Sequence, residues 1–121
     1  MSMTATFYIE RPTFTGESPS KQSLAVYTTA AGEDLLWSGC RCPLPDIGAT
    51  ILITMNSIGP AQVVGYFKEG GYLGVMTHAV NPPQWLIDQR ARDRENPRHA
   101  TKPQWWKDGI GCEFGTEIAD L

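Results

Sequence analysis

Residues 46–78 read DIGATILITMNSIGPAQVVGYFKEGGYLGVMTH, and this stretch decides the fold class. Three runs rich in β-branched and aromatic residues, at 49–55, 61–68 and 72–78, are separated by short turns of glycine, proline and asparagine. Runs of this kind between short turns are typical of an antiparallel meander, in which consecutive strands pair directly. We therefore predict a mainly β protein built around these three strands.

Residues on either side of the meander show weaker patterns of the same kind. Alternation of apolar and polar side chains predicts strands at 5–11 and 23–30, and a short strand at 35–38. The stretch 12–21 contains two prolines, a glycine and several hydroxyl residues, which indicates a loop.

The C-terminal third differs in character from the meander. Pro83 suits the start of a helix, and 84–94 contains helix formers without glycine or proline, so we predict a short helix there. Residues 96–111 hold two prolines and are expected to form an irregular loop. Residues 112–118 alternate again and are expected to form a last strand that closes the sheet.

Composition fits one domain over residues 1–121, with the barrel meander at 46–78, the helix and basic loop at 83–111 and the closing strand at 112–118. The 12 glycines and 9 prolines favour a turn-rich β domain, and the net charge of −3 selects no class of partner. No apolar run approaches the roughly 18 residues of a membrane span. The first residues lack the features of a signal peptide, which predicts a cytoplasmic protein without membrane contact.

The order of strand, turn, strand with a central glycine, glycine-rich turn and strand resembles the small Src-homology-3-like barrels, including KOW-like modules. The residues that carry this resemblance are Asp46, Gly48, Ile51, Ile53, Gly59, Val63, Gly65, Tyr66 and Gly74. It implies a single small antiparallel β-barrel with one short helix and a long C-terminal loop. Plasmid-type dihydrofolate reductases use such a barrel, but their Val-Gln-Ile-Tyr motif is absent, so their activity is not implied.

Spacing along the meander also predicts the core. Ile51 and Ile53 share one face of their strand, as do Val63 and Phe67, so we expect all four side chains to point into one core. Gly65, in the middle of its strand, would permit the sharp bend that a small barrel needs.

A basic and aromatic segment follows the meander. Residues 88–107 carry six basic side chains against three acidic ones, although the chain as a whole is acidic. Arginine next to exposed aromatic residues is common in protein hot spots and in single-strand binding. The predicted partner-binding residues are Arg90, Arg92, Arg94, Arg98, Lys102, Trp105 and Trp106.

Two details of this segment carry structural expectations. The pattern P-Q-W-x-x-D occurs at 83–88 and again at 103–108, and each copy is expected to be a helical turn begun by proline, with its tryptophan packed on the barrel. Trp105 and Trp106 are adjacent, so in an extended chain one would face the core and the other the solvent.

Residues able to perform chemistry form no recognisable motif. Cys40 and Cys42 are separated by one residue, whereas zinc sites usually space paired cysteines by two or more, so we predict no metal and no cofactor. Cys112 with His78 or His99 is a conceivable nucleophilic pair, but no helix N-terminus or glycine-rich elbow flanks it. We therefore predict that the protein is not an enzyme.

The expected function is binding. The tail at 113–118 resembles those of small phage and plasmid proteins, which implies an accessory factor that docks on a host protein or nucleoprotein complex. An inhibitor of host defence, of the anti-CRISPR kind, would fit this description. One alternative is a KOW-like module that binds nucleic acid, and another is a small enzyme that uses Cys112 and a histidine.

Overall fold

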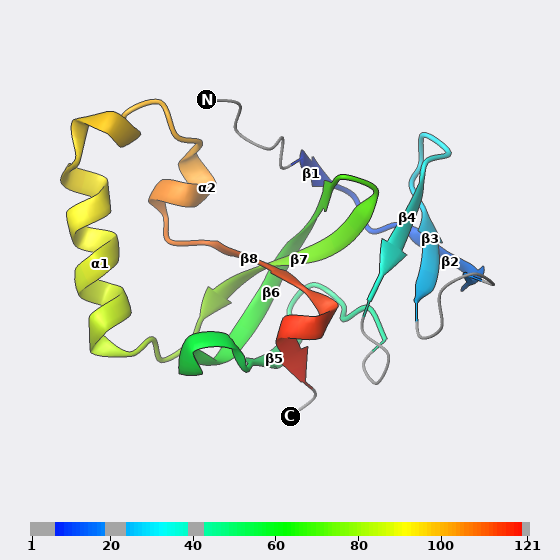
Figure 1. Cartoon of the computed structure of the whole chain (residues 1–121), viewed down its shortest axis with the longest axis horizontal. Helices are drawn as coiled ribbons and strands as arrows, with labels where there is room; N and C mark the ends of the chain where they lie inside the picture. Colours follow the sequence, from blue (N-terminus) through cyan, green and yellow to red (C-terminus); the bar gives the residue numbers. More distant parts are fainter. Residues whose placement is uncertain (1–6, 19–23, 39–42, 120–121) are drawn as a thin grey trace.

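The computed structural model of the chain describes residues 7–18, 24–38 and 43–119. Within these residues, nine strands form one open mixed sheet, and two α-helices follow its central hairpin (Figure 1). In chain order the elements are β1 (Phe7–Ile9), β2 (Thr13–Glu17), β3 (Ala25–Thr28), β4 (Asp34–Trp37), β5 (Thr50–Ile53), η1 (Met55–Ser57), β6 (Gly59–Glu69), β7 (Tyr72–Ala79), α1 (Gln84–Glu95), η2 (Pro97–His99), α2 (Gln104–Lys107), β8 (Gly111–Phe114), η3 (Gly115–Glu117) and β9 (Ile118–Ala119).

The meander predicted from the sequence is confirmed in β5, β6 and β7. Its long hairpin turns at Gly70 and Gly71, whose φ angles of 58° and 83° lie in the left-handed region that glycine tolerates. β6 pairs with β7 along one edge, while its other edge pairs first with β5 and then with β1. β7 pairs in turn with β4 and β8. The hairpin therefore joins four further strands into one sheet.

The expectation of a closed Src-homology-3-like barrel is wrong. The strand path runs β2-β3-β4-β7-β6-β5-β9, with β2 and β9 at its two ends, so the sheet stays open. The N-terminal strands extend the sheet beyond β7 through a parallel pairing of Leu36 with Tyr72, instead of folding across to meet β9. The protein is accordingly mixed α/β, with one parallel pair and two C-terminal helices.

Three local expectations also need correction. The supposed loop at 12–21 contains β2, because Thr13, Phe14 and Thr15 favour a strand, and a bulge between Phe14 and Gly16 keeps it paired with β3. The loop at 96–111 contains η2 and α2. The last strand is interrupted by η3, so that β8 pairs with β7 whereas β9 pairs with β5.

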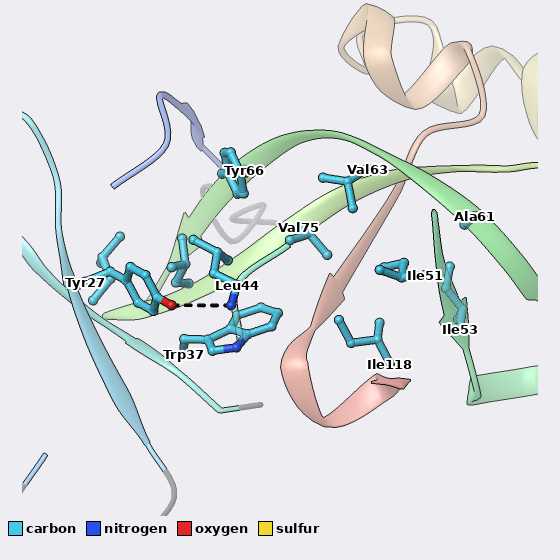
Figure 2. Close-up of a cluster of buried hydrophobic side chains, with 12 residues drawn as sticks. Tyr27, Trp37, Leu44, Ile51, Ile53, Ala61, Val63, Tyr66, Val75 and Ile118 are labelled. Atoms are coloured by element: carbon cyan, nitrogen blue, oxygen red, sulfur yellow. Dashed lines mark hydrogen bonds between the residues drawn. The ribbon is translucent and has the colours of Figure 1, made fainter. Parts of the chain in front are cut away.

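The hydrophobic core lies where the N-terminal hairpin meets the central one (Figure 2). Leu35 and Trp37 from β4 are fully buried, with 0% of their surface exposed, and Tyr27 packs beside them. The hydroxyl of Tyr27 accepts a hydrogen bond of 3.3 Å from the backbone N–H of Leu44, which ties the following loop to the core. The core also contains Ile51, Ile53, Ala61, Val63, Tyr66, Leu73, Val75 and Ile118.

Phe67 departs from the predicted core set. The ladder between β6 and β7 shifts between Val63 and Gly65, where a β-bulge inserts an extra residue. Beyond the bulge the alternation is reversed, so Tyr66 joins Val63 in the main core. Phe67 is buried instead against Phe114 of β8, with ring centroids 5.2 Å apart.

Arg11 fastens the loop before β5 to the sheet. Its guanidinium donates hydrogen bonds to the backbone oxygens of Leu44 and Pro45, at 3.2 and 3.1 Å, and to the hydroxyl of Tyr66 at 2.8 Å. It also forms an ion pair with Asp46 at 3.4 Å. Charge-assisted bonds of this kind are stronger than neutral ones, so Arg11 holds the loop in place.

We expect Ile53→Ala to lower the free energy of unfolding by about 2–5 kcal/mol, because it leaves a cavity among fully buried neighbours. Chemical denaturation followed by tryptophan fluorescence would measure the loss. A loss below about 1 kcal/mol, the range of solvent-exposed sites, would contradict the assignment of β5 to the core.

We expect Gly74→Ala to destabilise the fold more than Gly111→Ala. A Cβ at Gly74 would overlap the ring of Phe67 and lie 2.9 Å from the carbonyl oxygen of Glu113, whereas the nearest atom at Gly111 is 3.4 Å away. Overpacking of this kind costs about 1–3 kcal/mol or more. Parallel thermal melts of both variants would test the ranking, and equal stabilities would refute the packing of β8 on Phe67.

Candidate partner-binding site

The repeated P-Q-W-x-x-D pattern begins a helix both times, as expected. Pro83 and Pro103 occupy the N-cap positions of α1 and α2. In both copies the glutamine side chain donates to the aspartate four residues later, from Gln84 to Asp88 at 2.9 Å and from Gln104 to Asp108 at 2.8 Å. These i, i+4 pairs stabilise the first turn of each helix.

The tryptophans do not lie as predicted. Trp85 does not belong to the hydrophobic core and leaves 45% of its surface exposed. Trp105 and Trp106 lie in α2 rather than in extended chain, and both are half-buried. Trp106 is held between His99, whose ring centroid is 4.8 Å away, and the ammonium group of Lys102, which lies 5.4 Å from the Trp106 centroid.

A cleft of about 190 Å³ lies between α1 and the chain that runs from α2 to β8. In Figure 1, α2 lies between α1 and the sheet. One wall is a single face of α1, because its lining residues recur at helical spacing. The cleft is lined by Leu86, Gln89, Arg90, Asp93, Arg94, Trp106, Gly109 and Ile110.

This face of α1 is polar although it is turned toward the rest of the protein. Leu86 is the buried side chain of the helix, and the other α1 residues of the cleft carry amide or charged groups. A helix that only packed against its neighbours would place an apolar stripe on this side. Apart from Leu86, the wall that α1 contributes to the cleft is therefore polar.

Arg90 and Arg94 are one helical turn apart and line the same cleft. Arg90 is half-buried and packs over Gly109, where a Cβ would lie 3.2 Å from its Nη1 atom. In the described part of the chain, neither guanidinium takes part in an ion pair within 4.0 Å or a side-chain hydrogen bond. Burial and the neighbouring charge of Arg94 lower the pKa of Arg90, whereas Glu113 opposes that shift.

The other predicted binding residues are dispersed. Arg92 lies two positions from Arg90, about 200° around the helix, and so faces away from the cleft. Arg98 belongs to η2, Lys102 covers Trp106, and Trp105 is not among the residues that line the cleft. The structure thus brings Arg90, Arg94 and Trp106 together at the cleft, with Lys102 over Trp106, and leaves Arg92, Arg98 and Trp105 outside its lining.

Several residues of the site were missed from the sequence. Gln89, Asp93, Gly109 and Ile110 line the cleft, and Glu113 is close enough to act electrostatically on Arg90. The i, i+3, i+4 spacing of 86, 89, 90, 93 and 94 could have grouped the α1 residues on one face. No local pattern points to Gly109, Ile110 or Glu113, because their position depends on how α2 and β8 return to the sheet.

Glu113 is a buried carboxylic acid in β8, with 8% of its surface exposed. Burial, followed by a hydrogen bond with the Glu117 side chain and by the Glu117 charge, raises its pKa from 4.5 to about 8, against the opposing effect of Arg90. Glu117 is itself positioned by Thr54, whose backbone N–H and hydroxyl donate to its carbonyl oxygen at 3.0 and 3.1 Å. Near neutral pH, Glu113 is therefore mostly uncharged and only weakly neutralises Arg90.

The cysteines form no assembled site in the described ranges. Cys40 and Cys42 lie outside the described residues, and within those residues no group of three or more His, Cys, Asp or Glu side chains could hold a metal ion. The Cys112 thiol forms no hydrogen bond with His78 or His99. Burial, with the charges of Glu113 and Glu69, raises the pKa of Cys112 to about 12, which disfavours the thiolate form that a nucleophile needs.

Comparison with known proteins adds no functional assignment. No family model, no curated protein and no solved structure matches the chain. Each helix within residues 7–18, 24–38 and 43–119 is too short or too polar to cross a lipid bilayer.

We expect the free energy of unfolding to fall as pH rises from about 5 to about 9. Between 4.5 and about 8, the folded protein keeps a proton on Glu113 that the unfolded chain has lost, so raising the pH favours unfolding. Urea denaturation at several pH values would measure this slope.

Glu113→Gln should flatten the slope and make the variant more stable than the parent above about pH 8, because the amide stays uncharged. Glu95→Gln, at an exposed position of α1, is the matched control and should leave the slope unchanged. If Glu113→Gln keeps the parental slope, Glu113 does not hold the proton.

Proposed function

We propose that the protein is a non-catalytic binding protein that docks on a partner protein through α1, η2 and α2. The observation that carries this proposal is the cleft itself, in which two arginines stand next to half-buried Trp106 and form no ion pair with any residue that the structure describes. Arginine and tryptophan are among the residue types most enriched at binding hot spots. At such positions, truncation of one side chain removes much of the binding energy of an interface.

The surroundings of the cleft support docking of a macromolecule. Trp85 and Ile87, at the start of α1, leave 45% and 43% of their surfaces exposed, and Val80 just before them leaves 62% exposed. Trp85 and Ile87 are about 200° apart around α1, so they lie on opposite flanks of the helix face that lines the cleft. Exposed large apolar side chains beside a charged cleft are typical of a protein-binding surface. A partner could bury these side chains while it places a polar group between the arginines.

The titration of β8 supports binding rather than catalysis. Cys112 and Glu113 both hold their protons at neutral pH, so neither supplies an anionic nucleophile or a strong base. Glu113 is not among the residues that line the cleft, so a bound ligand would not meet its carboxyl group. That the partner belongs to a host, and that the protein is a phage or plasmid accessory factor, rests on the resemblance of the tail and is part of the proposal.

The test is affinity capture from nuclease-treated lysate with the folded protein and two variants. We expect the double variant Arg94→Glu with Trp85→Ala to lose captured partner by about tenfold or more, since charge reversal and loss of an aromatic anchor act together. Glu17→Arg, an exposed charge change on β2, should capture as much as the parent. If the double variant captures as much partner as the parent, the binding surface does not lie on the helices.

A further inference from the structure

We propose that the cleft between Arg90 and Arg94 is a carboxylate-binding site, which seats an acidic side chain of the partner protein. The inference rests on the proposed function and names the chemistry that the helical surface recognises. It follows from three features of the cleft: its unneutralised cations, its size and the arrangement of the remaining basic residues.

The two guanidinium groups of the cleft favour a bound anion. Removing a guanidinium partly from water is unfavourable unless an anion replaces the lost hydration, and a fork of N–H donors suits a carboxylate in two-point contact. Arg90 has lost part of its hydration against Gly109, and Arg94 stands one turn away with the same charge. A carboxylate placed between them would offset both the lost hydration of Arg90 and the repulsion between the two guanidinium groups.

Glu113 does not fill this role from within. Its pKa is raised to about 8, first by burial and then by its hydrogen bond with Glu117, so it is mostly protonated near neutral pH. The charged groups that act on this pair from neighbouring elements are Arg94 on α1 and Glu117 on η3. The Arg90 guanidinium is therefore not neutralised by Glu113 near neutral pH and can interact with an external anion. Its position is set by packing over Gly109.

The size of the cleft indicates one anionic group rather than a chain of them. Its volume of about 190 Å³ is smaller than the roughly 300–1,000 Å³ of drug-sized ligand pockets. The lining holds two arginines and Asp93, two positive charges less one negative, so a single carboxylate neutralises it and a second anion would be repelled. The site thus fits the end of an aspartate or glutamate side chain.

The other basic residues argue for a protein rather than a nucleic acid. Binding of a phosphate backbone uses a positively charged groove that follows the strand over several nucleotides. Here Arg92 points away from the cleft, the Lys107 ammonium donates to the carbonyl oxygen of Ala100 at 2.9 Å, and Lys102 covers Trp106. Acidic Asp88, Asp93 and Glu95 interrupt the same helix. The described basic groups therefore do not form a continuous track.

The experiment titrates the full-length protein, labelled with ¹⁵N, with a short acetylated peptide of alternating glutamate and glycine. The matched probe replaces every glutamate by glutamine, and a single-stranded oligothymidine tests the nucleic-acid reading. We expect the glutamate peptide to shift the Nε–Hε signals of Arg90 and Arg94 and the backbone signals of 86–94 and 106–110. It should bind about tenfold or more tighter than the glutamine peptide, since hydrogen bonds between charged groups contribute more to affinity than those to a neutral amide.

Variants of α1 locate the site. Arg94→Gln, at an exposed position that should not disturb folding, is expected to weaken the glutamate peptide about tenfold, and Arg90→Gln to do the same. Arg92→Gln removes the same charge from the opposite face and should change affinity less than about twofold. Affinity for the parent should also fall above about pH 8, where ionised Glu113 competes for Arg90.

Three outcomes would overturn the inference. These are equal affinity for both peptides, an equal loss from Arg92→Gln and Arg94→Gln, or tighter binding of oligothymidine than of the glutamate peptide. If any of these occurs while Arg94→Glu with Trp85→Ala still abolishes capture of a protein partner, docking through the helices stands and only the carboxylate chemistry is wrong. If capture is also unaffected, both proposals fail.

Discussion

The β-bulge between Val63 and Gly65 determines which side chains of the central hairpin enter the core, and the other strands are arranged around that hairpin. Before the bulge, Val63 points into the core, and after it Tyr66 does so. Phe67 is thereby turned to the opposite face, where it packs on Phe114 and holds β8 beside β7. β8 in turn carries Glu113 and returns the chain from α2, so the position of the cleft depends on the same bulge.

Much of the secondary structure could be predicted from the sequence because it depends on local alternation. β5, β6, β7 and α1 lie where the pattern places them. The barrel could not be excluded in this way, because closure depends on which edges meet, and the Leu36–Tyr72 parallel pairing joins residues far apart in the chain. Phe67 was misplaced for a related reason, since a strict period of two does not reveal where a bulge reverses the alternation.

The candidate site was predicted as a region but not as an arrangement. Excess positive charge and three tryptophans in and beside residues 88–107 indicated a binding segment, and α1, η2 and α2 occupy that segment. Within it, helical spacing separates Arg92 from Arg90 and Arg94 although all three are close in sequence. The contribution of Glu113 depends on tertiary contacts with Glu117 and Arg90, which no local pattern encodes.

The core and the cleft are thus linked through the hairpin, which supports the core on one side and, through β8, the polar cleft on the other. Native-state hydrogen exchange tests this claim most directly, because it ranks the stability of each element in one measurement. The backbone amides of Val63, Tyr66 and Val75 should exchange only by global unfolding, whereas those of α1 and of the β2–β3 hairpin should exchange by smaller openings. If the β6–β7 amides exchange as readily as those of α1, the hairpin is not the element on which the rest depends.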